Sequence, residues 1–371
     1  MAVVGGGVIG LACGWRAAQR GLRVCVLERG RPGGGATHAA AGLLTPVTDA
    51  EFGEEALMQL SLESAELYPA FAAELEDVTG HDVGYERTGS LYVALDRDEL
   101  EALRRLHTLH ERLGLAAEWL SGRECRHAEP GLATTCTGGV RVASEAQVDP
   151  RRLAVALAEA LTLAGGELRA PAEVVEARRA GGRIVALVTA DGREVVADRI
   201  VVAAGCWSGS CACLPPELEL PVRPVKGQIL RLRAPDGTRP AAVVIRTGAV
   251  YIVPRATGEV VVGATEEEHG FDVTVTAGGV HELLREAYRA LPDIAELEFV
   301  EACARLRPGS PDNAPLIGAS VDGLVVATGH YRKGILLAPV TAEAVAAELA
   351  GDPRSPGLEE FSPSRFEAVR A

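Results

Sequence analysis

The hydrophobic pattern at the start of the chain predicts a strand, a helix and a second strand. Residues 2–4 are apolar, residues 11–20 have helical spacing and end at Gly21, and residues 22–27 are apolar again up to Glu28. Short apolar runs bounded by glycine are typical of buried strands. The order strand, helix, strand is that of a βαβ unit with parallel strands. We therefore expect the chain to open with a parallel sheet.

Later apolar segments extend this sheet. Residues 199–205 and 324–328 are apolar apart from Arg199 and Thr328, as expected of strands that are buried on both faces. Helical spacing of apolar positions predicts helices over 56–75, 150–164 and 335–349. Because these segments lie far apart in the sequence, the nucleotide-binding domain is predicted to be discontinuous, over residues 1–80, 145–218 and 302–371.

A second set of segments alternates polar and apolar positions, which predicts a mixed, largely antiparallel sheet. These segments are residues 86–95, 138–143, 224–232, 249–263 and 299–306, with helices expected over 98–113 and 281–291. A smaller antiparallel meander is expected over 172–196. The predicted class is α/β, with a Rossmann-like domain and an α+β substrate domain over residues 81–144 and 219–301.

The glycines after the first strand indicate a dinucleotide site. Gly5, Gly7 and Gly10 fit the pattern G-x-G-x-x-G and are separated by Gly6, Val8 and Ile9. The first glycine permits a tight turn, the second lets the backbone approach a pyrophosphate, and the third lets the helix pack on the strand. The helix N-terminus attracts the phosphates. Glu28, at the end of the second strand, is placed to accept hydrogen bonds from a ribose.

Composition and charge narrow the function classes. The 371 residues are 47% hydrophobic, enough for two domains, and the formal net charge is −14. This charge argues against nucleic acid and anionic membranes as partners. No signal peptide or membrane-spanning run is recognisable, so we expect a cytoplasmic protein. Cys211 and Cys213 have no second ligand pair at zinc spacing, so no metal site is predicted.

Three stretches together resemble the D-amino-acid-oxidase-like family of FAD-dependent amine oxidoreductases. They are GGGVIG with Glu28, VVAAGCWSG over 201–209, and RLRPGSPDNAPLIG followed by GHYRKGILLAP over 305–339. Within the family, the stretches ATHAAAGLLTP, PVKGQIL, YIVPR and VVGAT are most similar to its glycine-oxidising members, which serve thiamine biosynthesis. The resemblance spans almost the whole chain. It implies oxidation of glycine to its imine by hydride transfer to flavin, with oxygen reduced to hydrogen peroxide and glyoxylate and ammonia released on hydrolysis.

The resemblance also implies which residues bind FAD. Besides the first glycine motif, they lie in the segment after Glu28, in the meander, after the strand over 199–205, and in the turn after the last strand, where Gly329 is a further candidate. These residues are Gly5, Gly7, Val8, Ile9, Gly10, Glu28, Arg29, Ala40, Ala41, Gly42, Leu43, Val174, Ala204, Gly205, Trp207, His330, Arg332, Gly334, Ile335 and Leu336. Backbone N–H groups of the last turn can stabilise negative charge on the reduced flavin.

An amino-acid substrate needs a cation for its carboxylate, and the planar fork of arginine binds a carboxylate through two hydrogen bonds. Arg307 matches the family's carboxylate-binding arginine, Tyr251 matches a tyrosine whose hydroxyl adds a hydrogen bond, and Arg332 matches a further basic residue. The alternatives without a function are that the arginine forms a surface ion pair and that Tyr251 packs in the core. Hydride transfer needs a neutral amine and good alignment, so no acid or base is assigned, His330 included.

Two departures from the family pattern affect the interpretation. Relatives that attach flavin covalently use a Cys near the position of Arg305 and carry a Lys near Val261, and neither residue is present here, although Cys303 is close. We therefore expect noncovalent FAD. Glu266 stands where an apolar residue is expected, which questions the polarity of the substrate pocket.

Several alternatives remain open from the sequence. The enzyme could be a D-amino-acid or sarcosine oxidase, or a dehydrogenase that passes electrons to another acceptor. It could be a non-catalytic flavin-binding or tRNA-modifying subunit, although Arg307 and Tyr251 together argue against this, or an NAD-dependent dehydrogenase. Expected partners are a small amino-acid substrate and oxygen, further copies of the chain in a homo-oligomer, and a functional link to thiazole synthase.

Overall fold

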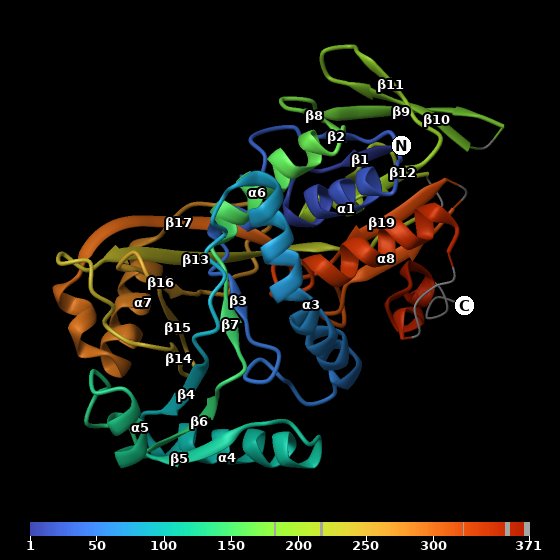
Figure 1. The fold of residues 1–371 in the computed structure, drawn as a ribbon. Helices are drawn as coiled ribbons and strands as arrows, with labels where there is room; N and C mark the ends of the chain where they lie inside the picture. The colour runs from blue at the N-terminus through green and yellow to red at the C-terminus, as the bar shows by residue number, and fades with distance from the viewer. Residues whose placement is uncertain (182, 216–217, 322, 353–356, 367–371) are drawn as a thin grey trace.

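Two large sheets organise the chain (Figure 1). The computed structural model describes residues 1–366 apart from 182, 216–217, 322 and 353–356. The first sheet has six strands, in the order β18 (Leu316–Ala319), β19 (Leu324–Thr328), β12 (Ile200–Val202), β1 (Ala2–Val4), β2 (Cys25–Leu27) and β8 (Glu167–Arg169). The second has eight strands, in the order β17 (Glu298–Gly309), β13 (Arg223–Arg233), β16 (Glu259–Gly263), β15 (Tyr251–Pro254), β14 (Val244–Arg246), β4 (Ser90–Ala94), β6 (Gly138–Val142) and β5 (Glu118–Ser121).

The six-stranded sheet contains the predicted βαβ unit. β1 pairs in parallel with both β2 and β12, so that Val3 lies between Val26 and Val201. β12 and β2 continue in parallel to β19 and β8, and β18 alone runs antiparallel to its neighbour. The residues of β1, β2, β12 and β19 are all buried, which explains their continuous apolar sequence. The predicted α/β class is confirmed.

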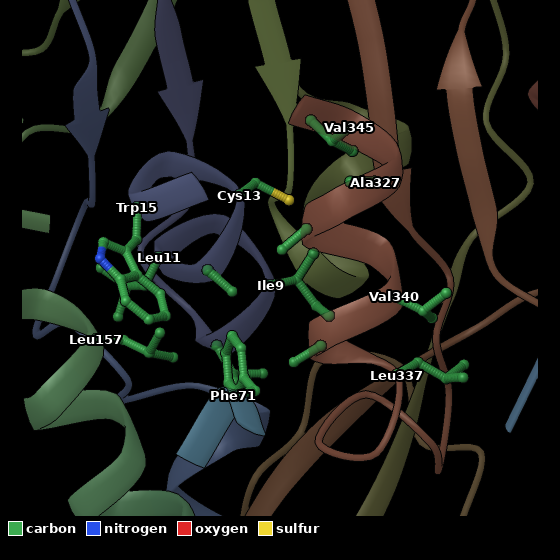
Figure 2. Close-up of a cluster of buried hydrophobic side chains, with 14 of the residues drawn as sticks. Ile9, Leu11, Cys13, Trp15, Phe71, Leu157, Ala327, Leu337, Val340 and Val345 are labelled. Atoms are coloured by element: carbon green, nitrogen blue, oxygen red, sulfur yellow. The ribbon is translucent and has the colours of Figure 1, made fainter. Parts of the chain in front are cut away.

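Four helices pack together beside this sheet: α1 (Val8–Gln19), α3 (Glu55–Thr79), α6 (Pro150–Leu163) and α8 (Ala338–Ala350). Figure 2 shows their shared core, in which Trp15, Phe71 and Leu157 come from three different helices. The rings of Trp15 and Phe71 meet edge to face with centroids 5.6 Å apart, a favourable aromatic geometry. This core fixes the N-terminus of α1 against the sheet.

Helix starts follow the predicted chemistry in α6, where Pro150 occupies the first turn and the Asp149 side chain accepts hydrogen bonds from the next two backbone N–H groups. The helix predicted over 281–291 begins earlier, as α7 (Ala277–Ala290), because the Thr276 side chain caps it by accepting from Gly279 N. The strand predicted from Leu22 pairs only from Cys25, after the chain has left the helix.

The eight-stranded sheet is antiparallel throughout, except that β14 and β4 run in parallel. This confirms the predicted mixed, largely antiparallel sheet. The predicted domain boundary at residue 302 falls inside β17, which pairs with β13 from Glu298 to Gly309. The division into two discontinuous domains otherwise stays a prediction, and its last residues, 367–371, lie outside the described part of the chain.

The remaining elements are short or peripheral. The predicted meander is a three-stranded antiparallel sheet of β9 (Val174–Ala180), β10 (Arg183–Thr189) and β11 (Glu194–Val196). The other elements are α2 (Ala36–Ala39), β3 (Leu43–Leu44), β7 (Ala146–Gln147), α4 (Arg97–Arg112), α5 (Gly122–Ala128), and the 3₁₀ turns η1 (Gly205–Ser210), η2 (Pro292–Glu296), η3 (Leu358–Phe361) and η4 (Pro363–Phe366). Within the described residues, no helix has the length and apolar character needed to cross a membrane.

Candidate active site

A cavity of about 1150 Å³ lies where the two large sheets meet. From the six-stranded sheet it is lined by the carboxyl ends of β1, β2, β12 and β19, and from the eight-stranded sheet by residues of β13, β15, β16 and β17. Ligands of open α/β sheets bind at the carboxyl ends of parallel strands. The volume exceeds the roughly 300–1,000 Å³ of most small-molecule sites, so the cavity can hold a large cofactor together with a substrate.

The cavity brings together the residues that the sequence singled out, with two exceptions, Gly10 and Gly329. Its lining includes Gly5, Gly7, Val8, Ile9, Glu28, Arg29, Ala40, Ala41, Gly42, Leu43, Val174, Ala204, Gly205, Trp207, Tyr251, Arg307, His330, Arg332, Gly334, Ile335 and Leu336. Gly10 is not part of the lining. A Cβ atom there would overlap the carbonyl oxygen of Gly5, so Gly10 lets α1 pack against the turn beneath the cavity.

The turn between β1 and α1 is shaped for an anionic group. Gly7 precedes α1 and supplies no side-chain cap, and a Cβ atom on Gly7 would meet only the Thr37 hydroxyl, at 3.6 Å. The carboxylate of Glu28 is held at the edge of this turn. Its Oε2 accepts from Gly6 N at 2.7 Å and its Oε1 accepts from Gly30 N at 2.8 Å. The geometry fits a pyrophosphate over the helix N-terminus, with a ribose beside Glu28.

Aromatic and cationic side chains close the same end of the cavity. The guanidinium of Arg29 lies 3.7 Å from the ring centroid of Trp207, and Trp207 stacks on Phe271 with centroids 5.8 Å apart. Phe271 lines the cavity although nothing in the local sequence pattern indicated it. Cys303 is buried on β17 and is not among the lining residues, which fits noncovalent binding.

The turn after β19 forms another wall of the cavity. Gly329 has a positive φ of 74°, and Tyr331 N donates to Pro308 O at 3.0 Å, which holds the turn against β17. His330 points into the protein, where its Nε2 lies 3.0 Å from the hydroxyl of Thr341. Burial lowers the pKa of His330 to about 3, so the imidazole is neutral at physiological pH. This environment supports leaving His330 without an acid–base role.

At the other end of the cavity, Arg307 and Tyr251 lie flat on the eight-stranded sheet. A Cβ atom on Gly227 would overlap the guanidinium of Arg307, and a Cβ atom on Gly263 would overlap the ring of Tyr251. Arg307 Nη1 donates to Thr265 O at 3.1 Å. The two glycines therefore provide the space in which these side chains reach the cavity.

Burial raises the pKa of Tyr251, although the positive charges of Arg307 and Arg246 act in the opposite direction. The phenol is therefore protonated and can donate a hydrogen bond. Within the described residues, no carboxylate lies at ion-pair distance from Arg307, whose hydrogen bonds go to the carbonyl oxygens of Lys226 and Thr265. An arginine beside a phenol, without a carboxylate at ion-pair distance among the described residues, is suited to a substrate carboxylate.

Three further charged side chains line this end and were not assigned from the sequence: Asp49, Arg246 and Lys333. Arg246 lies opposite Tyr251 in the β14–β15 pair and forms an ion pair with Asp49. Lys333 Nζ donates to Asp49 O at 3.1 Å, and burial together with the charge of Arg246 lowers the pKa of Lys333 to about 8. Arg246 was foreseeable, because a hairpin between residues 246 and 251 places these two positions side by side.

Arg332 does not stand alone in the cavity. It forms an ion pair with Glu266 and a second one with Glu51, in which the Nη1 to Oε1 distance is 3.2 Å. Tyr331 also donates from its hydroxyl to Glu266 at 2.6 Å. The structure thus gives Arg332 two carboxylate partners, whereas Arg307 has none among the described residues.

A dinucleotide turn and an arginine without an ion-pair partner among the described residues line the same cavity, which is the arrangement expected of a cofactor-dependent enzyme. A family model described as FAD dependent oxidoreductase matches residues 1–348. The glycine oxidase of Geobacillus kaustophilus is 38% identical over 350 residues, covering 93% of this chain and 91% of that protein. A crystal structure of glycine oxidase from the same organism matches with a TM-score of 0.92 and 36% identity, covering 98% of each chain.

A second kind of relative is longer. The bifunctional protein ThiO/ThiG of Trichormus variabilis is 36% identical over 369 residues, which is 98% of this chain but 55% of that protein. The chain belongs to the D-amino-acid-oxidase-like family of FAD-dependent oxidoreductases. The resemblance and the FAD cofactor inferred from the residues are confirmed, and an NAD-dependent dehydrogenase is set aside.

Proposed function

We propose that this protein oxidises glycine to its imine with FAD as cofactor and oxygen as electron acceptor. The observation that carries the proposal is the pair Arg307 and Tyr251, a free cation and a protonated phenol at the end of the cavity away from the dinucleotide turn. Similarity to glycine oxidases along nearly the whole chain supports it. Bound FAD would accept the hydride from the substrate α-carbon and pass two electrons to oxygen, giving hydrogen peroxide.

The residues of the chain bind and orient the substrate. The Arg307 fork takes the carboxylate, and the Tyr251 hydroxyl donates a further hydrogen bond to it. Both side chains are fixed on sheet strands, so the carboxylate has a defined position and the α-carbon is held facing the cofactor part of the cavity. The neutral His330 faces the protein interior and takes no part in proton transfer. The substrate therefore has to react as its neutral amine.

We also propose that the imine is hydrolysed to glyoxylate and ammonia or supplied to thiazole synthesis. The bifunctional protein ThiO/ThiG supports the second route, because about half of its length (55%) resembles this chain. Thiazole synthase is accordingly the expected functional partner. A homo-oligomer and a cytoplasmic location stay predictions.

The decisive experiment is flavin bleaching in the absence of oxygen. Purified protein should be yellow, and glycine, sarcosine, D-alanine and D-proline are each added in parallel, followed by air. The proposal expects glycine to bleach the flavin, and air to restore the colour with formation of peroxide. Bleaching by a D-amino acid but not by glycine would move the function to that substrate, and bleaching that air does not reverse would indicate another electron acceptor.

A further inference from the structure

Glu266 places a negative charge at the substrate end of the cavity. It follows Thr265, whose carbonyl oxygen accepts a hydrogen bond from Arg307. The backbone of Glu266 is therefore next to the residue that contacts the carboxylate-binding arginine, and Glu266 lines the same cavity. The resemblance to the family predicts an apolar residue at this position. A carboxylate beside the place where an anionic substrate binds calls for a physical reason.

The contacts of Glu266 show where its charge is directed. One oxygen accepts from the Tyr331 hydroxyl at 2.6 Å, and the other forms an ion pair with Arg332. Partial burial by itself would raise the pKa of Glu266, but the Tyr331 hydrogen bond and the charges of Arg332 and Arg307 together hold this pKa below its usual value. Glu266 is therefore ionised at neutral pH and neutralises Arg332.

The second partner of Arg332 lies on a different side. Glu51 contacts the same guanidinium but does not line the large cavity. It lines a small adjoining cavity together with Glu54 and Asn313. Of the two carboxylates on Arg332, only that of Glu266 belongs to a residue that lines the large cavity. The two residues have similar exposure, 49% and 50% of the side chain, so they form a matched pair for substitution.

We propose that Glu266 is a specificity-determining residue that restricts this cavity to amines with one carboxylate, an inference that rests on the function proposed above. Arg307 is the free cation that takes the first carboxylate, and Arg246 is paired with Asp49. A second carboxylate on the substrate would need Arg332, which Glu266 already occupies, and it would meet the negative charge of Glu266 itself. Rejection by an occupied cation and a like charge is a common way to build specificity.

The test compares two substrates that differ by one carboxylate: sarcosine, and iminodiacetate, in which the N-methyl group carries a second carboxylate. The variant Glu266→Gln removes the charge at nearly constant shape, and Glu51→Gln is the matched control. Glu266→Gln should raise the ratio of kcat/KM for iminodiacetate to that for sarcosine by roughly ten- to a hundredfold, the range of one charge-assisted hydrogen bond. Glu51→Gln should change this ratio less than about threefold, because Glu51 does not line the large cavity.

Two further measurements make the result specific to Arg332. Adding Arg332→Met to Glu266→Gln should abolish the gain, since the second carboxylate then has no cation. Binding of methoxyacetate and oxydiacetate, which lack the amine, is followed by the flavin absorption spectrum, and Glu266→Gln should tighten oxydiacetate selectively. Glu266→Ala is made alongside and should behave in the same way, so the conclusion does not depend on how glutamine packs.

Three outcomes would overturn the inference. The first is that Glu266→Gln and Glu266→Ala change neither the kcat/KM ratio of iminodiacetate to sarcosine nor the affinity ratio of oxydiacetate to methoxyacetate. The second is that Glu51→Gln gives an equal gain, and the third is that the wild type already oxidises iminodiacetate with the same kcat/KM as sarcosine. These outcomes differ from failure of the proposed function. A wild type whose flavin is not reduced by any amino acid contradicts the function, whereas the inert ligand pair still reports whether Glu266 excludes a second carboxylate.

Discussion

Replacement of Arg307 by leucine tests the placement of the substrate most directly. The side chain extends from β17 across Gly227 and lines the cavity, and its Nη1 donates to the backbone carbonyls of Lys226 and Thr265. Leucine fits the same space without a charge. The sheet beneath should persist, because the backbone pairing of residue 307 with Val225 does not depend on the side chain.

The magnitude follows from the bonds that are lost. A hydrogen bond to a charged group contributes about 1.5–3 kcal/mol, and each 1.4 kcal/mol is about tenfold in an equilibrium or rate ratio. Arg307→Leu should therefore lower kcat/KM for glycine by roughly ten- to a hundredfold, or more if both nitrogens bind the carboxylate. Much of the loss should appear in KM, because the carboxylate is held in the ground state as well as in the transition state.

The assay is steady-state peroxide formation with glycine, with flavin content measured on the same preparations. Flavin content should stay at the wild-type value, since Arg307 lies at the end of the cavity away from the dinucleotide turn. Arg307→Lys should lie between wild type and leucine, because a lysine keeps the charge but loses the planar fork. If Arg307→Leu kept wild-type kinetics on every amino acid tested, the carboxylate site would be wrongly placed, and an amine without a carboxylate would become the better substrate.

Three further predictions concern the cofactor and the half-buried Lys333. Gly7→Val should fold but purify with little flavin, as measured by absorbance, because a side chain there meets only Thr37 and otherwise enters the space assigned to the pyrophosphate; full flavin content would contradict this. Acid precipitation should release all the flavin into the supernatant, and a yellow pellet would point to Cys303. Burial lowers the pKa of Lys333 from 10.5 to about 8. The charged lysine therefore destabilises the fold below about pH 8, and the stability of the fold recovers as the pH rises from about 8 to 10.5. Lys333→Met should therefore raise the urea midpoint at pH 7 more than at pH 10, and equal shifts at both pH values would argue against the lowered pKa.

The dinucleotide half of the site could be predicted from the sequence because its geometry is local. Gly5, Gly7 and Gly10 are separated by a few residues, and the φ of 111° at Gly5 and the close approach at Gly10 are constraints that only glycine satisfies without strain. Glu28 follows directly from the end of β2. Short-range pattern and backbone sterics therefore suffice for this part.

The charge pairing at the substrate end could not be predicted in the same way. Arg246 meets Asp49 and Arg332 meets Glu266 across long stretches of sequence, and periodicity carries no information about such distances. Which arginine is free and which is neutralised depends on the packing of both sheets and of the turn after β19. Short elements such as α2 could not be predicted from the sequence, because four residues are too few to show a helical period.

The two groups of residues in the substrate pocket differ in how rigidly the fold holds them. This difference assigns affinity for the carboxylate to one group and substrate specificity to the other. Arg307 and Tyr251 stand on β17 and β15, each lying over a glycine of the neighbouring strand, so their positions are fixed by sheet register. Glu266 and Arg332 stand on connecting segments and are half exposed. Groups on strands are held more rigidly than groups on loops, and loops accept substitution more readily. The carboxylate anchor is therefore the rigid part of the geometry, whereas the Glu266–Arg332 pair is the part of the pocket whose change would give a different substrate range on the same sheet.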